Sequence, residues 1–146
     1  MNKSAPVSIL LVDDHVLIRE SWKILLENNP HFKVIAECGN GPSAIAFARE
    51  LAPDIILLDV NMQPPDGLNL TQKLLQAVPN SKIIGLSVNN SPRVALRMVE
   101  LGAKGYLTKT SPLMEINHGI TEVLYGRVYI CEEIKQNIPQ DEHKSE

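Results

Sequence analysis

The sequence predicts an α/β protein in which helices cover both faces of one parallel sheet. Five short apolar runs alternate with longer segments of helical spacing along the 146 residues. Two of the runs, at 9–12 and 55–58, are apolar at every position, which is typical of strands buried on both faces. Repeated strand–helix units join parallel strands through right-handed crossovers, so the connecting helices cover both faces of the sheet.

The first half of the chain contains two strand–helix units and a third strand. Its strand segments are rich in Ile, Leu and Val, and its helical segments carry apolar residues or alanines at helical spacing. A Gly-Asn-Gly-Pro turn at 39–42 precedes the second helix. We expect, in chain order, a strand at 7–12, a helix at 16–27, a strand at 32–38, a helix at 43–51 and a strand at 54–59.

The second half continues the alternation, and capping residues mark its helices. Asp66 can cap the first of them, and Pro79 breaks the chain after it. Ser-Pro pairs at 91–92 and 111–112 place proline in the first turn of the last two helices, and Gly102 ends the earlier one. We expect a helix at 67–78, a strand at 82–87, a helix at 91–101, a strand at 104–107 and a helix at 111–125.

Composition indicates one globular domain and argues against several functions. The length suffices for one core, and the chain is 44% hydrophobic and 21% charged. The net charge of −3 does not favour direct nucleic-acid binding. We expect no signal peptide and no membrane partner, because no apolar run reaches the length of a membrane span. Cys38 and Cys131 have no metal-binding spacing and are consistent with a reducing, cytoplasmic location.

Charged and polar residues follow the predicted strands. Asp13 and Asp14 follow the first strand, Asp59 ends the third, Ser87 ends the fourth and Lys109 follows the fifth. In an open doubly wound sheet the functional site lies at the carboxyl ends of the strands. Adjacent carboxylates repel each other, so a positive charge is expected beside them. Carboxylate oxygens suit a divalent cation, above all Mg²⁺, and Lys109 supplies a second positive charge.

Other polar residues are interpreted structurally. Asp66 is interpreted as a helix cap. The four histidines are scattered without ligand spacing, so we assign them no chemistry: His15, His31, His118 and His143.

Four segments closely resemble the receiver domain of bacterial two-component response regulators. They are LLVDDH at 10–15, DIILLDVNM at 54–62 with Asp66-Gly67 after it, IIGLSVNN at 83–90 and GAKGYLTKTSP at 102–112. The resemblance covers residues 7 to about 126. The phrases LSVNN, GYLTKTSP and GRVYI are similar to the LuxR/NarL (FixJ)-type transcriptional branch.

The resemblance implies a fold and a division of the chain. The fold would be the flavodoxin-like (βα)5 receiver, a five-stranded parallel sheet with strand order 2-1-3-4-5. Residues 5–126 would form the receiver domain. Residues 127–146 would be a linker or frayed tail toward an output domain that is not in this chain.

The resemblance also implies roles for the residues at the strand ends. Asp59 would be the phosphoacceptor, a carboxylate nucleophile that forms an aspartyl-phosphate. Asp14, Asp59 and the backbone carbonyl of Asn61 would ligate Mg²⁺, and Asp13 would reach it through water. Ser87 and Lys109 would contact phosphoryl oxygens. Tyr106 would be a switch residue that turns inward when Ser87 moves toward the phosphoryl group.

A sensor histidine kinase would donate the phosphoryl group. The resemblance implies a signalling switch, not an enzyme with turnover, whose output is transcription. DNA would be bound only through the output domain. A homodimer would form through the fourth helix, the fifth strand and the fifth helix, because helix-turn-helix regulators commonly read paired half-sites. The alternative interpretation of these two helices is an ordinary core with a solvated charged face.

Three positions depart from the family pattern without removing a functional residue. Gln63 and Thr110 stand where the family often has proline, and Val88 stands where it often has alanine.

Alternative functions have different sequence requirements. A stand-alone receiver that acts through protein contact has the same motifs. A haloacid-dehalogenase-type phosphatase would need a second aspartate where this chain has Asn61. A flavodoxin-like FMN module would need a Ser/Thr/Gly-rich loop after the first strand, and a dinucleotide-binding domain would need G-x-G-x-x-G there.

Overall fold

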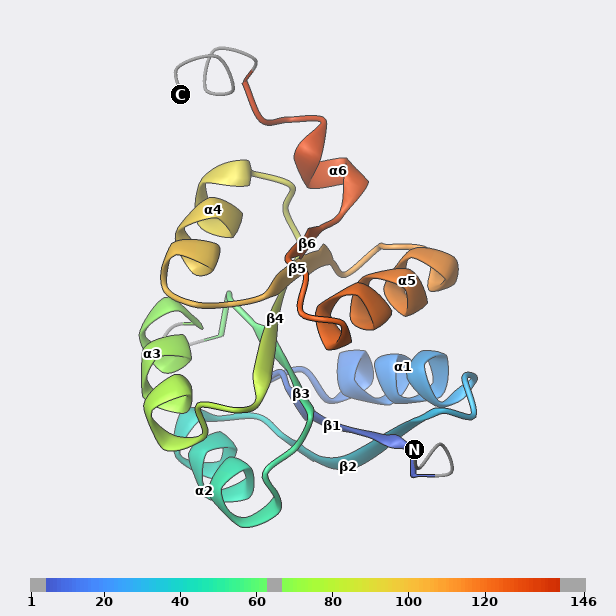
Figure 1. Ribbon diagram of the computed structural model, residues 1–146, viewed down its shortest axis with the longest axis vertical. Coiled ribbons are helices and arrows are strands. Elements are labelled where there is room, and N and C mark those ends of the chain that lie inside the picture. Colours follow the sequence, from blue (N-terminus) through green and yellow to red (C-terminus); the bar gives the residue numbers. More distant parts are fainter. Residues whose placement is uncertain (1–4, 63–66, 140–146) are drawn as a thin grey trace.

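The computed structural model describes residues 5–62 and 67–139 as alternating strands and helices (Figure 1). The strands are β1 Val7–Val12, β2 Phe32–Cys38, β3 Ile55–Asp59, β4 Lys82–Ser87, β5 Gly105–Thr108 and β6 Tyr129–Ile130. The helices are α1 Val16–Glu27, α2 Gly41–Leu51, α3 Gly67–Ala77, α4 Pro92–Glu100, α5 Leu113–Leu124 and α6 Glu132–Lys135. Within the described residues, no helix has the length and apolar character needed to cross a bilayer.

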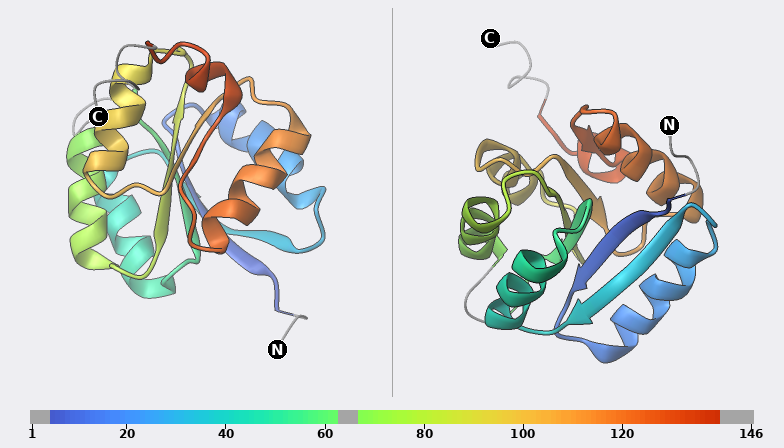
Figure 2. Two further views of the ribbon diagram at one scale, coloured as in Figure 1. Left: turned by 45° about the horizontal axis from the view of Figure 1, so that its top comes forward. Right: turned by 60° about the horizontal axis from the view of Figure 1, so that its bottom comes forward.

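The strands form one parallel sheet between two layers of helices. They pair in the order β2-β1-β3-β4-β5-β6. Helices α1 and α5 lie on one face of the sheet, and α2, α3 and α4 lie on the other (Figures 1 and 2). Because both faces are covered, the central strands are apolar at almost every position, and residues 9–12 and 55–58 are 0–1% exposed.

The ten predicted elements are all present, and their ends differ from the predicted ones by at most two residues. Helix α2 begins earlier than predicted because part of the expected turn serves as its cap. The side chain of Asn40 accepts a hydrogen bond from the Ser43 amide at 2.8 Å, and Pro42 lies in the first turn. The predicted capping residue Asp66 lies outside the described residues.

Among the described residues the sheet has six strands, which corrects the predicted five-stranded sheet. The order 2-1-3-4-5 is present and is extended by β6. Tyr129 donates its amide to the Lys104 carbonyl, and Cys131 donates to the Tyr106 carbonyl, both at 3.0 Å. Cys131 and Ile134 are fully buried. The expectation of a frayed tail is therefore wrong for residues 127–139, because this segment completes the edge of the sheet and buries two apolar side chains.

Gly85 in β4 allows the Tyr106 ring to pack against the backbone. A Cβ atom at this position would lie 2.8 Å from Tyr106 Cδ1 and 3.0 Å from Met98 Cε. Tyr106 and Met98 are both 0% exposed. The absence of a side chain at Gly85 thus determines where the Tyr106 ring lies.

Gly85→Ala should destabilise the fold by about 1–3 kcal/mol, the usual effect of an overpacked core. Chemical denaturation would measure the change in the free energy of unfolding. Tyr106→Leu in the Gly85→Ala protein should cost less than Tyr106→Leu in the parent, because the overlap with the ring is then absent. Equal costs in the two backgrounds would contradict this explanation.

Candidate functional site

The predicted site residues meet at one edge of the sheet. The parallel register pairs Val12 with Leu58, Asp59 with Leu86 and Ser87 with Thr108, so the strands end together. The structure therefore brings together the side chains that follow or end β1, β3, β4 and β5: Asp13, Asp14, Asp59, Ser87 and Lys109.

A buried cluster of opposite charges forms the centre of the site. Lys109 Nζ lies 2.6 Å from Asp13 Oδ2 and 3.3 Å from Asp59 Oδ1. The side chains of Lys109, Asp13 and Asp59 are 6%, 3% and 1% exposed. The Lys109 amide also donates to the Ser87 carbonyl at 2.8 Å, which fixes the start of the loop after β5. One ammonium group therefore compensates two carboxylates away from bulk water.

Asp59 combines a fixed oxygen with a free one. Its Oδ1 accepts a hydrogen bond from the Asn61 amide at 2.9 Å. Its Oδ2 is buried and has no hydrogen-bond partner among the described residues. Burial raises the pKa of Asp59 and the Asp13 charge adds to this effect, whereas the Asn61 amide and Lys109 oppose it. Within 5–62 and 67–139, Oδ2 is thus a buried acceptor left open for another group.

The carboxylates fit a divalent cation. Ligand atoms of Asp13, Asp14, His15 and Asp59 all lie within 4.8 Å of one another. The side chain of Asp14 is 29% exposed, so this carboxylate is open to solvent at the mouth of the site. Oxygen ligands of this kind, together with the open Asp59 Oδ2, suit Mg²⁺, which takes one or two carboxylates and keeps several waters.

His15 lies against the acid pair, although sequence reasoning assigned it no chemistry. Its Nδ1 is 3.1 Å from Asp13 Oδ1 and 3.0 Å from Asp14 Oδ1. Its amide donates to Asp13 Oδ1 at 2.9 Å, and its side chain is 67% exposed. Direct adjacency to the two aspartates was the signal that could have identified it.

Arg19 is a second residue that sequence reasoning missed. Its Nη1 donates to the Asp13 carbonyl at 2.7 Å, and its Nε donates to Glu37 Oε1 at 2.8 Å. Arg19 therefore connects the turn after β1 with the end of β2 through these two hydrogen bonds. Residues 19 and 37 belong to different elements, so no local pattern indicates this contact.

Ser87 and Tyr106 lie on the neighbouring strands β4 and β5. Ser87 Oγ donates to Asn61 Oδ1 and accepts from the Asn89 amide, both at 3.2 Å. The Tyr106 side chain points inward and is 0% exposed. Burial raises the pKa of Tyr106, and the nearby Ser87 hydroxyl partly opposes that shift. The serine thus connects the loop after β3 to the loop after β4.

Two of the three departures from the family pattern, Val88 and Thr110, lie at the surface and not in the buried charge cluster. Val88 is 69% exposed, and Thr110 is also exposed. Gln63 lies outside the described residues.

Comparison with known proteins identifies the family. Residues 9–121 match the response regulator receiver domain. The chain is 34% identical over 132 residues to response regulator GacA of Pseudomonas aeruginosa, a match that covers 90% of this chain and 62% of GacA. It is 33% identical over 132 residues to response regulator UvrY of Escherichia coli, with 90% and 61% covered. The chain thus spans about three fifths of the length of these curated relatives.

Solved structures agree with this assignment. A two-component response regulator of the LuxR family from Aurantimonas superposes with a TM-score of 0.88 at 32% identity, over 97% of this chain and 100% of that one. The receiver domain of the response regulator NarL from Mycobacterium tuberculosis superposes with a TM-score of 0.77 at 26% identity, over 84% and 99%. The family predicted from the motifs is confirmed: the chain belongs to the response regulator receiver family, in its LuxR/NarL-type branch.

Proposed function

We propose that this chain is a phosphorylation-dependent switch of a two-component system, in which Asp59 accepts a phosphoryl group from a sensor histidine kinase with Mg²⁺. The observation that carries the proposal is the buried Asp59 carboxylate. Its Oδ2 is unpartnered among the described residues, and its Oδ1 lies 3.3 Å from the Lys109 ammonium. A nucleophilic carboxylate beside a fixed cation is suited to receive a phosphoryl group.

The transfer needs few changes in bonding. An oxygen of the ionised Asp59 carboxylate attacks phosphorus, the bond from phosphorus to the donor's histidine nitrogen breaks, and that nitrogen keeps the electron pair. When bound, Mg²⁺ neutralises charge on the transferring group. Asp14, Asp59 and the Asn61 carbonyl would hold the ion, and Asp13 would reach it through water. The Lys109 ammonium, which already lies beside Asp59, would contact an oxygen of the phosphoryl group. Each chain accepts one phosphoryl group on Asp59 and releases no product to a second substrate. We therefore describe it as a switch and not as an enzyme with turnover.

Phosphorylation is converted into a structural change through Ser87. Its hydroxyl turns from Asn61 toward a phosphoryl oxygen, and the loop after β4 follows. Tyr106 is expected to turn inward as Ser87 moves, but its side chain is already 0% exposed in this structure. The proposed movement is therefore that of Ser87 and the loop, with Tyr106 inward in both states. The face formed by α4, β5 and α5 then differs between the two states, and a second copy of the chain can distinguish them.

The proposed output is transcription. The curated relatives are named response regulators, and the LuxR-family likeness supports a DNA-binding output domain that is not in this chain. Dimerisation through α4, β5 and α5 would pair two such domains. The same site would also serve a receiver that acts by protein contact alone. A phosphatase is disfavoured because Asn61 stands where that class needs an aspartate.

A small phosphodonor tests the proposal directly. The protein is incubated with acetyl phosphate and Mg²⁺, digested, and analysed by mass spectrometry at neutral pH. One phosphoryl group, labile to hydroxylamine, should appear on the peptide that contains Asp59. A protein that remains unmodified, or that is modified on another residue, would overturn the proposal.

Millimolar Mg²⁺ should raise the melting temperature of the protein, because the ion binds the folded state and relieves repulsion among the carboxylates. At about one hundred times the dissociation constant the gain approaches roughly 2.7 kcal/mol. Asp14→Ala should lose this gain. Glu50→Ala, which removes an exposed carboxylate on α2, is the matched control and should keep it. Thermal melts in chelator and in Mg²⁺ measure the rise in melting temperature for each variant. Equal stabilisation of the two variants would show that Asp14 is not a ligand.

A further inference from the structure

The C-terminal helix α6 is hydrogen-bonded to the loop between β4 and α4. Asn90 Nδ2 donates to Glu133 Oε2 at 3.2 Å, and Asn137 Nδ2 donates to the Asn90 carbonyl at 3.1 Å. These bonds join positions 43 and 47 residues apart in the chain. The loop that directly follows Ser87 is therefore held by one side chain of α6, Glu133, and by one side chain just after this helix, Asn137.

Glu133 also contacts the strand that leads to Lys109. Thr108 Oγ1 donates to Glu133 Oε1 at 3.1 Å, and Thr108 is 1% exposed. In the sheet Thr108 is paired with Ser87, and Lys109 follows it directly. The two oxygens of the Glu133 carboxylate thus bridge the end of β5 and the loop after β4. One of these segments leads to Lys109 and the other follows Ser87, so both adjoin the proposed phosphoryl site.

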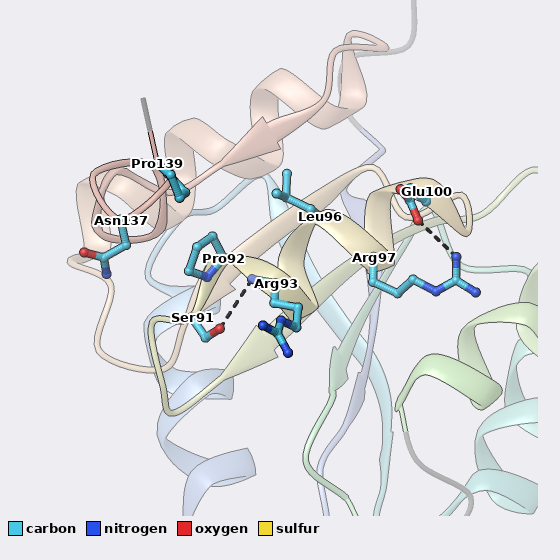
Figure 3. A pocket seen from close by; sticks show the side chains of 8 residues that line it. All are labelled: Ser91, Pro92, Arg93, Leu96, Arg97, Glu100, Asn137 and Pro139. Carbon is cyan, nitrogen blue, oxygen red and sulfur yellow. Dashed lines mark hydrogen bonds and ion pairs between the residues drawn. The ribbon is translucent and has the colours of Figure 1, made fainter. Parts of the chain in front are cut away.

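Helix α6 is itself anchored to the domain. The Cys131 amide donates to the Tyr106 carbonyl at 3.0 Å, and Cys131 and Ile134 are fully buried. At the other end of the segment, Asn137 and Pro139 line a pocket together with Ser91, the cap of α4, and with Pro92 and Leu96 of that helix (Figure 3). Because α6 is held at its start, a displacement of the loop must break the bonds to Asn90 or move the end of α6.

We propose that Glu133 is a positioning residue that couples the state of Asp59 to residues 131–139. The coupling rests on the proposed phosphorylation of Asp59. The bonds from Asn90 to Glu133 and Asn137 stabilise the arrangement without a phosphoryl group. When Ser87 turns toward the phosphoryl group, the loop leaves these partners, and α6 loses its contact with the loop. Coupling is reciprocal, so weakening the bonds must also strengthen binding of a phosphoryl mimic.

Two single variants remove the same bond by different chemistry. Glu133→Ala removes a carboxylate, and Asn90→Ala removes its partner without any change of charge. Glu132→Ala is the matched control, because it removes one carboxylate from the same helix. Glu132 Oε2 lies 3.7 Å from Lys135 Nζ in an exposed ion pair. Among residues 5–62 and 67–139, the Glu132 side chain forms no hydrogen bond to the loop between β4 and α4.

The test measures binding of beryllofluoride with Mg²⁺ to the 146-residue protein, together with hydrogen exchange of the α6 amides. In the parent, beryllofluoride should accelerate exchange of the amides of residues 134–138, which are bonded within the α6 turns. Glu133→Ala and Asn90→Ala should each bind beryllofluoride about fivefold more tightly, a modest coupling. Their α6 amides should exchange rapidly with or without the mimic. The double variant should bind no more tightly than either single variant, and Glu132→Ala should match the parent.

The outcomes separate this coupling from the function it rests on. If the parent binds beryllofluoride while its α6 amides exchange unchanged, the coupling is overturned and the switch at Asp59 stands. Equal behaviour of Glu133→Ala and Glu132→Ala, or additive effects of Glu133→Ala and Asn90→Ala, would also overturn the coupling alone. If a folded parent does not bind beryllofluoride, both the switch and the coupling are overturned.

Discussion

Asp59→Asn should take up no phosphoryl group under conditions in which the parent protein takes up one. The amide has nearly the same shape as the carboxylate but lacks the negative charge and the nucleophilic oxygen. Intact-protein mass spectrometry after incubation with acetyl phosphate and Mg²⁺ measures the uptake. Asp54→Asn is the matched control, since Asp54 immediately precedes β3 and lies at the opposite end from Asp59. Labelling of Asp59→Asn at the parent's rate would contradict the assignment.

The same substitution should raise the melting temperature at neutral pH in the presence of a chelator. Burial raises the pKa of Asp59, so protonation of this carboxyl is more favourable in the folded state than in the unfolded state. The stability linked to this group is present below its ordinary pKa and is lost as the pH rises through the raised pKa. Asparagine stays neutral throughout. Its advantage over the parent should therefore be largest at neutral pH and shrink toward acidic pH, and a difference that is constant with pH would contradict this explanation.

Lys109→Ala should be strongly destabilising and should nearly abolish phosphorylation. The ammonium lies 2.6 Å from Asp13 and 3.3 Å from Asp59, and all three side chains are buried. Removing one partner of a buried ion pair leaves an uncompensated charge, which typically costs about 3–5 kcal/mol. Loss of a fixed charge-stabilising group should slow phosphoryl transfer by about a hundredfold or more. Urea denaturation and the labelling rate measure the two effects.

Two further variants identify the cause of the Lys109 effect. Lys104→Ala removes an exposed lysine just before β5 and should change neither stability nor labelling appreciably. Adding Asp13→Asn to Lys109→Ala should recover part of the stability, because it removes one of the two uncompensated carboxylates, but it should not restore labelling. Similar stability of Lys109→Ala and Lys104→Ala would show that the buried charge cluster is not important for the fold.

The order of strands and helices could be predicted because the signals are local. Residues 9–12 and 55–58 are short runs that are apolar at every position, which is typical of strands covered on both faces. The Ser-Pro pair at 91–92 marks the start of α4 locally, since its cap is made with the next residues: Ser91 Oγ accepts a hydrogen bond from the Arg93 amide. Patterns of this kind are complete within a few residues, so they need no knowledge of the rest of the fold.

Strand β6 and helix α6 could not be predicted for the opposite reason. Tyr129–Ile130 is a strand because its backbone pairs with β5, and two residues are too few to show alternation. Helix α6 has four residues, of which only the buried Ile134 is apolar, and so short a helix gives no periodic pattern of its own. These elements exist through contact with β5 and α4, which lie elsewhere in the chain.

The candidate site also has a part that could be predicted from the sequence and a part that depends on contacts between distant segments. The sequence by itself determined that Asp13, Asp14, Asp59, Ser87 and Lys109 share one edge, because parallel strands end together. Only the tertiary structure decided that Lys109 lies closer to Asp13 than to Asp59 and that Glu133 reaches both Thr108 and Asn90. Such contacts depend on strand register and on where each helix packs, and those are settled by the whole core and not by any local run of residues.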